Sequence, residues 1–301
     1  MKAKLIDGKA VAERINGETA AGVAKLKEEH KLQPGLAVVL IGDDPASQTY
    51  VNMKSKKSAE LGIYSEKRIL PKETTQKEVL SIIEELNNDG RINGILVQSP
   101  PPPHIDEDAI INAIRPEKDV DCFHPENVGR MLNGEEDGFM PCTPYGVMML
   151  LKYSGIDPDG KHAVILGRSN IVGKPMMALL VQKTKGANAT VTVCHSRTQN
   201  IAYHTRQADI LIAAIGRPEF VKADMVKEGV VIIDVGMNRV KDASHPKGFR
   251  NTGDVDFKNV SEKASYITPV PGGVGPMTIA TLMRNTLKAC MMQNKITIWK
   301  L

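Results

Sequence analysis

Short apolar runs alternate with longer amphipathic stretches along this 301-residue chain, and that alternation is the feature that most constrains its fold. Runs of this kind are typical of strands buried in a parallel sheet, and the stretches between them are long enough for the helices that join parallel strands. The pattern therefore predicts an α/β protein built on parallel sheets.

The alternation forms two series. The first contains expected strands at Leu36–Ile41, Ser65–Leu70 and Gly94–Gln98, with helices at Lys9–His30, Ser47–Leu61, Thr75–Asn87 and Glu107–Ile114. The second contains expected strands at His162–Leu166, Thr190–Cys194, Ile210–Ala214, Val230–Val235 and Tyr266–Thr268. An apolar helix over Thr143–Ser154 separates the two series, and the chain is long enough for two cores. We therefore expect one domain at residues 1–142, to which the last helix at 278–301 returns, and a second at residues 143–277.

Composition narrows the functional classes. The net charge is only +4 with dispersed basic residues, and the densest basic cluster, Lys54–Lys57, is too short to indicate a nucleic-acid partner. No apolar run is long enough to span a membrane, and the first residues lack the apolar core of a signal peptide. The four cysteines have no CxxC spacing and the histidines are scattered, so we expect a cytoplasmic protein with free thiols and no built-in metal.

The segment Pro269–Thr278 is dense in proline and glycine. Proline locks φ, whereas glycine permits backbone angles and close approaches that a Cβ forbids. The segment follows a short strand and precedes a helix from Thr278 to Cys290. We expect a stiff loop that holds a flat ligand against main chain; an ordinary tight connection is the alternative.

A nucleotide site is predicted where the strand His162–Leu166 runs into Gly167, Arg168, Ser169 and, at the start of a helix, Gly173. A glycine at the end of such a strand lets main chain approach a pyrophosphate, which then lies at the N-terminus of the following helix. The spacing does not fit an ATP P-loop, because the second glycine comes one residue late and Pro175 occupies the hydroxyl position.

The end of the next strand distinguishes the two dinucleotides. NAD-binding folds usually place an acid there to accept from the ribose 2′-OH, but this strand ends in Cys194, His195, Ser196 and Arg197. Ser196 and Arg197, together with Arg168, suit a 2′-phosphate instead, because guanidinium groups bind phosphate oxygens in pairs. The sequence therefore favours NADP over NAD, the alternative being a strand end with solvated polar residues.

Reactive residues gather in the first half. Tyr50 and Lys54 share a helix face, where partial burial can lower the pKa of a lysine into the range useful for proton transfer; an ordinary surface pair is the alternative. Gln98 ends a parallel strand, where side chains meet ligands. Further on, Asp119 and Asp121 point the same way if their segment is extended, where one carboxylate could bind an aminopyrimidine edge or both could bind Mg²⁺. A nucleophilic Cys122–His124 pair is disfavoured, because near neighbours do not form such a dyad by themselves.

Together these segments resemble the bifunctional methylenetetrahydrofolate dehydrogenase/methenyltetrahydrofolate cyclohydrolase family over essentially the whole chain. The resemblance is carried by five segments in order: 50–54, 94–98, 116–121, 167–175 and 269–278. It implies two α/β domains flanking a cleft, a folate-binding catalytic domain and a Rossmann-type NADP-binding domain, in a homodimer.

The resemblance also implies roles in one-carbon folate metabolism. NADP⁺ oxidises 5,10-methylenetetrahydrofolate, and water then opens the methenyl cation to 10-formyltetrahydrofolate. By position, the hydrolysis belongs to Lys54, oriented by Gln98. Tyr50 stacks on the folate and Asp121 holds its aminopyrimidine edge. Residues at three further positions, Pro271, Gly272 and Gly273, line the folate pocket.

Two residues depart from the family pattern: Cys122 stands where the family usually has glycine, and Ser99 where it usually has leucine. Neither removes a catalytic group. Two other functions stay open from the sequence: a dehydrogenase that has lost the hydrolytic step, and a non-catalytic regulator that binds NADP or folate.

Overall fold

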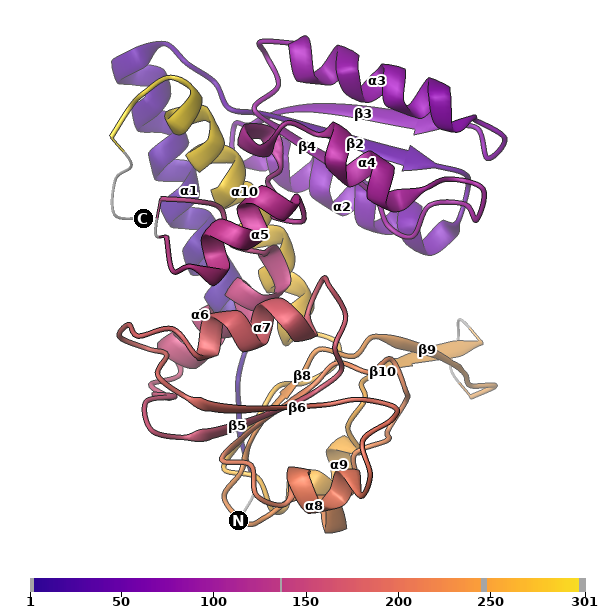
Figure 1. Ribbon diagram of the computed structural model, residues 1–301, viewed down its shortest axis with the longest axis vertical. Helices are drawn as coiled ribbons and strands as arrows, with labels where there is room; N and C mark the ends of the chain where they lie inside the picture. The colour runs from indigo at the N-terminus through magenta and orange to yellow at the C-terminus, as the bar shows by residue number, and fades with distance from the viewer. Residues whose placement is uncertain (1–2, 136, 245–247, 298–301) are drawn as a thin grey trace. The chain divides into compact units, whose positions relative to one another are not determined.

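The computed structural model describes residues 3–135, 137–244 and 248–297, and the chain divides into two compact units (Figure 1). Glu13–Cys142 and Ile279–Leu301 form one, which we call the three-stranded unit. Met1–Ala12 and Thr143–Thr278 form the other, the six-stranded unit. Both are built on parallel sheets, so the α/β class expected from the alternation is confirmed.

The three-stranded unit contains a parallel sheet in the order β3-β2-β4. Its strands are β2 (Gly35–Ile41), β3 (Tyr64–Leu70) and β4 (Gly94–Val97). Its helices are most of α1 (Gly8–His30), α2 (Pro45–Glu60), α3 (Gln76–Asn88), α4 (Glu107–Ala113), α5 (Pro125–Leu132) and most of α10 (Val274–Gln293). These bounds agree with the expected elements to within a few residues, apart from α5, which was not expected, and the start of α10.

Strand β2 is the centre of this unit, and every one of its residues is buried. Alternate side chains point to opposite faces of a strand. Leu36, Val38 and Leu40 pack into a core with residues of α1, α2 and α10. Ala37, Val39 and Ile41 pack into a second core with residues of α3 and α4. Burial on both faces explains the unbroken apolar run that identified this strand.

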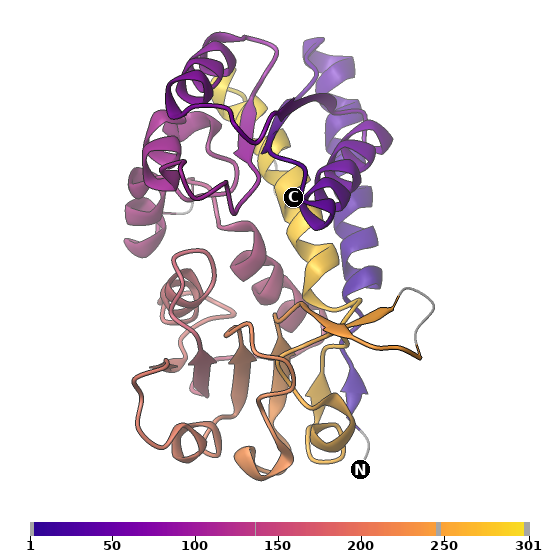
Figure 2. The same ribbon diagram turned by 90° about the vertical axis from the view of Figure 1, so that its right-hand side faces the viewer.

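The six-stranded unit has the strand order β1-β11-β8-β7-β5-β6, and all its pairings are parallel. Its strands are β1 (Lys4–Leu5), β5 (His162–Leu166), β6 (Thr190–Cys194), β7 (Ile210–Ala213), β8 (Val231–Asp234) and β11 (Tyr266–Ile267). Its helices are α6 (Cys142–Tyr153, whose first residue belongs to the other unit), α7 (Gly173–Leu180), α8 (Ile201–Thr205) and α9 (Phe257–Val260). An antiparallel hairpin of β9 (Asn238–Lys241) and β10 (Phe249–Thr252) stands out from it (Figure 2).

The N-terminus corrects the expected domain assignment. Residues 1–12 were assigned to the first domain, but they belong to the six-stranded unit together with Thr143–Thr278. The cause is strand β1, which pairs in parallel with β11 and forms an edge of that sheet. A two-residue strand is too short to leave a periodic pattern, so its partner decides where it belongs.

The start of α10 corrects a second expectation. The helix begins at Val274, not at Thr278, so the proline- and glycine-rich segment is a loop only over its first half. Pro276 lies in the first turn of the helix, where backbone N–H groups have no partner inside the helix and proline is tolerated. None of the helices in the described ranges is both long and apolar enough to cross a membrane.

Candidate functional site

Lys54 and Gln98, predicted to act together, are in direct contact within the three-stranded unit. Nζ of Lys54 on α2 donates a hydrogen bond of 3.0 Å to Oε1 of Gln98, which follows β4. Nε2 of Gln98 donates to the carbonyl of Ser99 at 2.9 Å, and this fixes which end of the amide faces the lysine. Ser99, one of the two departures from the family pattern, therefore serves this contact through its backbone.

The amine of Lys54 is in an unusual setting for a lysine, because only 7% of the residue is exposed. Burial lowers its pKa below the ordinary value, and the nearby Asp121 and Cys142 oppose part of that shift. Loss of the proton from a buried ammonium avoids the cost of holding a charge away from water. The site thus provides an amine that is already neutral, and so able to accept a proton, at a lower pH than the amine of an exposed lysine. Tyr50, half-buried, lies one helical turn earlier on the same face of α2.

The two predicted carboxylates, Asp119 and Asp121, have different environments. Asp119 is 4% exposed, and its oxygens accept the backbone N–H groups of Phe123 and His124 at 3.1 and 2.8 Å. They also accept Nδ2 of Asn127 at 2.8 Å. Asp121 is half-buried and interacts electrostatically with Lys54. Asp121 is therefore the carboxylate available to a ligand, and Asp119 holds the local backbone.

The segment around these carboxylates is not extended, contrary to the sequence-based expectation. Residues Pro116–Lys118 form a 3₁₀ turn, and a turn continues through Val120 and Asp121. The buried ammonium of Lys118 donates to the carbonyls of Leu86 and Asp89 at 3.0 and 2.9 Å. These contacts anchor the turn to the end of α3. The conformation of this segment is therefore set by the hydrogen bonds of the Asp119 side chain and by the contact of Lys118 with the end of α3. Neither contact can be recognised from the alternation of apolar and amphipathic segments.

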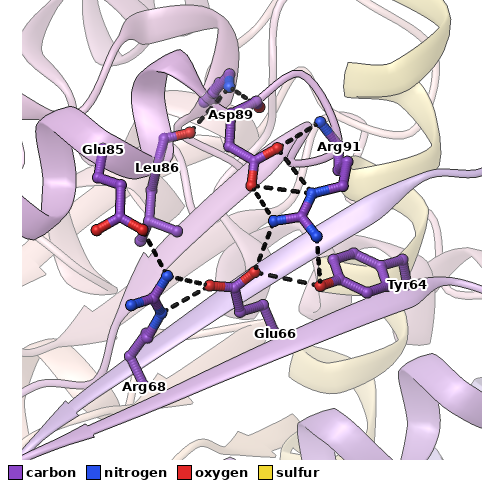
Figure 3. A network of polar contacts seen from close by, with 8 residues as sticks. Tyr64, Glu66, Arg68, Glu85, Leu86, Asp89 and Arg91 are labelled. Atoms are coloured by element: carbon purple, nitrogen blue, oxygen red, sulfur yellow. Dashed lines mark hydrogen bonds and ion pairs between the residues drawn. The ribbon is translucent and has the colours of Figure 1, made fainter.

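A network of charged side chains on β3, α3 and the loop before β4 surrounds that helix end (Figure 3). Glu66 lies between Arg68 and Arg91, and Arg68 also pairs with Glu85 at 2.7 Å. Arg91 pairs with Asp89 at 2.6 Å and lowers the pKa of that carboxyl to about 2. Asp89 joins this network to the turn, because its carboxylate pairs with Arg91 while its backbone carbonyl accepts from Lys118.

The thiols of Cys122 and Cys142 are buried beside this site. Burial raises the pKa of both, and the Asp121 carboxylate raises that of Cys142 further. Cys122 donates to the carbonyl of Phe139, and the ring of His124 caps α5 by accepting from Glu126. The geometry therefore gives no support to a nucleophilic Cys122–His124 pair. Cys142 and the buried amide of Asn285, which donates to the Val120 carbonyl, were missed by the sequence reasoning.

The glycine loop of the six-stranded unit lies at the carboxyl end of β5. Gly167 has a φ of +118°, and a Cβ there would lie 2.2 Å from the carbonyl oxygen of Ala214. Only glycine fits this position, and it leaves main chain open at the N-terminus of α7. Oγ of Ser169 accepts the N–H of Val172 at 3.2 Å and so orders the same turn. The residues present fit a pyrophosphate approaching bare backbone.

The residues predicted to bind a 2′-phosphate lie at one edge of the same sheet. Strands β5 and β6 are parallel neighbours in which Leu166 pairs with Cys194. Arg168 and Ser196 each follow these paired ends by two residues, and Arg197 comes next. All three are exposed. The arrangement presents two guanidinium groups and a hydroxyl, with no carboxylate at the end of β6, as phosphate recognition requires.

The remaining predicted residues, Pro271, Gly272 and Gly273, lie just before α10. Pro271 is exposed, whereas the two glycines are buried. A Cβ on Gly273 would lie 2.7 Å from the carbonyl oxygen of Pro269, so the turn is tightly closed. Within residues 3–135, 137–244 and 248–297, no group of three or more His, Cys, Asp and Glu side chains gathers in a way that could hold a metal ion.

Comparison with known proteins gives matches over both units. Residues 6–121 match the family model described as tetrahydrofolate dehydrogenase/cyclohydrolase, catalytic domain. Residues 141–294 match the NAD(P)-binding domain of the same family. The chain is 55% identical over 293 residues to the bifunctional protein FolD of Chlorobium phaeobacteroides, covering 97% of this chain and 98% of that protein.

Two solved structures are similar along nearly their full length. The bifunctional FolD enzyme, a methylenetetrahydrofolate dehydrogenase/cyclohydrolase from Campylobacter jejuni, is 50% identical with a TM-score of 0.91, covering 98% of this chain and 100% of that one. The FolD enzyme of Trypanosoma brucei, solved with NADP cofactor and an inhibitor, is 41% identical with a TM-score of 0.93, covering 98% of this chain and 99% of that one.

Proposed function

Because this chain belongs to the tetrahydrofolate dehydrogenase/cyclohydrolase family, we propose that it catalyses two consecutive reactions of one-carbon folate metabolism. The first is the NADP-dependent oxidation of 5,10-methylenetetrahydrofolate to the 5,10-methenyl cation. The second is the hydrolysis of that cation to 10-formyltetrahydrofolate. The observation that carries the second activity is the buried contact between Lys54 and Gln98, which a dehydrogenase alone does not need.

The oxidation requires orientation more than acid–base groups, since a hydride moves between two rings held face to face. NADP⁺, when bound, supplies the hydride acceptor. The chain's part is to hold the pyrophosphate at Gly167, Ser169 and Gly173, and the 2′-phosphate at Arg168, Ser196 and Arg197. The exposed guanidinium groups on neighbouring strand ends support this assignment.

The hydrolysis requires a proton acceptor near the methenyl carbon. Water adds to that carbon and gives up one proton. The hydroxyl proton of the adduct then passes to the N5 ring nitrogen as the bond between that nitrogen and the carbon breaks, which leaves the formyl group on N10. Lys54 in its neutral form takes the proton, because burial lowers its pKa and the substrate cation disfavours a second positive charge nearby. Gln98 orients the amine through the 3.0 Å hydrogen bond.

The folate is held by groups of different chemistry. Tyr50 offers a ring for stacking, one helical turn from Lys54. Asp121 accepts two N–H groups from the aminopyrimidine edge, a role for which its neighbour Asp119 is already saturated. Pro271, Gly272 and Gly273 present a closed turn to the substrate.

We further propose that the protein is cytoplasmic and forms a homodimer. Light scattering of the purified protein measures its molar mass and would test the dimer.

One assay separates this function from its alternatives. The protein is mixed with 5,10-methylenetetrahydrofolate and NADP⁺, and NADPH absorbance is followed; the same experiment is repeated with NAD⁺. In parallel, decay of added methenyl substrate is followed without cofactor. We expect both reactions, with NADP⁺ preferred. NADPH without methenyl hydrolysis would indicate the single-activity dehydrogenase, and neither signal would indicate a non-catalytic binding protein.

A further inference from the structure

The loop that follows β7 borders the place where a dinucleotide binds in this fold. In the sheet order, β5 lies between β6 and β7, so the chain leaves β5 toward one side and later returns on the other. Dinucleotides bind at the carboxyl ends of strands where the strand order reverses in this way. The loop Ala214–Gly216 therefore faces the glycine loop, and the Ala214 carbonyl lies directly against Gly167.

A fully buried carboxylate holds this loop. Asp254 has no solvent exposure, and its Oδ2 accepts the backbone N–H groups of Ile215 at 2.7 Å and Gly216 at 3.0 Å. Its Oδ1 accepts Nδ2 of Asn238, the first residue of β9, at 2.8 Å. One side chain thus fixes the loop after β7 and the chain that follows β8.

A second buried carboxylate holds the first. Asp234, the last residue of β8, accepts the backbone N–H groups of Asp254 at 2.9 Å and Val255 at 3.0 Å. It also accepts the N–H of Gly236 at 2.9 Å. The backbone approaches so closely that a Cβ on Gly253 would lie 1.8 Å from Oδ2 of Asp234. The position of Asp254 is therefore set by the sheet itself through Asp234.

Burying two carboxylates to hold one loop has a high cost in free energy. Within the described ranges, no Lys, Arg or His forms an ion pair with either carboxylate. Burying a carboxylate without a counter-ion is unfavourable, and the backbone N–H groups together with the side-chain amide of Asn238 offset that cost. Hydrogen bonds to a charged acceptor are shorter and more directional than neutral ones, which suits a loop whose position must be accurate.

We propose that Asp254 is a positioning residue for the NADP site: it places the loop Ala214–Gly216 against the glycine loop at Gly167. This inference rests on the proposed NADP-dependent function. Asp254 does not touch the cofactor itself; it acts through the backbone of Ile215 and Gly216. The hydrolysis of methenyl substrate uses no NADP⁺, so its rate serves as an internal control for the NADP⁺-dependent oxidation in the same variant.

The test is Asp254→Asn, which keeps shape but replaces one acceptor oxygen with an N–H donor. We expect the dissociation constant for NADP⁺, measured by calorimetry, to rise at least tenfold, and KM for NADP⁺ to rise with it. Hydrolysis of methenyl substrate and KM for the folate stay near wild-type values. Asp209→Asn is the matched control, because Asp209 accepts the N–H of His162 at the opposite ends of β5 and β7. It should lower stability and leave NADP⁺ binding unchanged.

A merely structural role predicts something different. In that case both activities of Asp254→Asn fall by one factor while the NADP⁺ dissociation constant stays at the wild-type value, and the proposal is overturned. If that variant does not fold, Asn238→Ala removes one of the three donors at a half-buried position, and a several-fold weaker NADP⁺ affinity is expected. Absence of NADP⁺ binding by the unaltered protein would instead refute the proposed function.

Discussion

Nζ of Lys54 lies 3.0 Å from Oε1 of Gln98, at a position where the lysine is 7% exposed. If the buried amine is the proton acceptor of the hydrolysis, Lys54→Met should reduce the rate of methenyl hydrolysis by about 10²–10⁴-fold, the usual contribution of a general base. NADP⁺ affinity should be unchanged. Stopped-flow decay of methenyl absorbance measures the first quantity and calorimetry the second.

The control for that variant is Lys57→Met on the same helix, where the lysine pairs with Glu60 at the surface. It should hydrolyse at the wild-type rate. Methenyl hydrolysis by Lys54→Met at an undiminished rate would remove Lys54 from the mechanism.

The pH dependence of hydrolysis should report the pKa of Lys54. Only the neutral amine accepts a proton, so the rate rises with pH as Lys54 is deprotonated, with a midpoint below the ordinary lysine value because burial lowers the pKa. Gln98→Glu places a carboxylate beside the ammonium, which raises that pKa. The rising limb of the pH–rate profile should therefore move to higher pH. A profile that does not move would show that another group titrates.

Most strands and helices of the two units could be predicted because burial produces an apolar pattern in the sequence, whereas the short helices α5, α8 and α9 could not. Strand β2, buried on both faces, is an unbroken apolar run, and α3 begins at a capping box formed by Thr75 and Glu78. Strand β1 and the β9–β10 hairpin could not be predicted. The first is too short for a period, and the second has a half-exposed pattern.

The residues of the candidate site likewise fall into those that could be predicted from local sequence and those that depend on distant contacts. Lys54 and Gln98 end up in contact because a helix face and a strand end are local features that the sequence encodes. The choice between Asp119 and Asp121 is not local. It depends on a 3₁₀ turn anchored by Lys118 and on the amide of Asn127, contacts that form only when distant segments meet. Asp234 and Asp254 escaped notice for the same reason.

Preference for NADP⁺ should depend on Arg197. A charge-assisted hydrogen bond contributes about 1.5–3 kcal/mol, so Arg197→Ala should raise KM for NADP⁺ by roughly 10–150-fold. KM for NAD⁺, which has no 2′-phosphate, should change little. Steady-state kinetics with the two cofactors measure the ratio. Arg206→Ala, which removes a guanidinium bound to the carbonyl of Asp224, is the control. Equal losses with both cofactors would place the 2′-phosphate elsewhere.

Cys122 should tolerate glycine and reject valine. Its φ is +62°, in the left-handed region that a Cβ disfavours by about 1–2 kcal/mol and a β-branched side chain disfavours further. Glycine relieves this strain but loses buried surface and gains freedom when unfolded, so Cys122→Gly should change the free energy of unfolding by no more than about 1 kcal/mol. Cys122→Val should destabilise by about 2 kcal/mol or more.

Urea unfolding measures these differences, with Cys290→Val in α10 as the control. Cys290 is equally buried but belongs to a regular helix, so its replacement should cost less than about 1.5 kcal/mol. Equal costs of valine at the two positions would show that the left-handed backbone at Cys122 carries no strain.

Asp234 should make stability depend on pH in the direction opposite to most carboxylates. Burial raises its pKa to about 7, against an ordinary value of 3.8. Hydrogen bonds from backbone N–H groups lower this pKa in part, and the nearby Asp254 carboxylate raises it. The folded state therefore holds a proton that the unfolded state has lost between these values. Its contribution to stability is fully present below pH ~4, declines as the pH rises, and is lost above pH ~7.

At ~1.4 kcal/mol per pKa unit, this contribution is on the order of 4 kcal/mol. Asp234→Asn does not titrate, so the difference in the free energy of unfolding between wild type and variant should change by this amount between pH 4 and 7.5, with wild type relatively more stable at the lower pH. Urea unfolding across that range measures it. A difference that is constant with pH would mean that Asp234 is already ionised in the folded protein at pH 4, held so by the three N–H groups of Gly236, Asp254 and Val255.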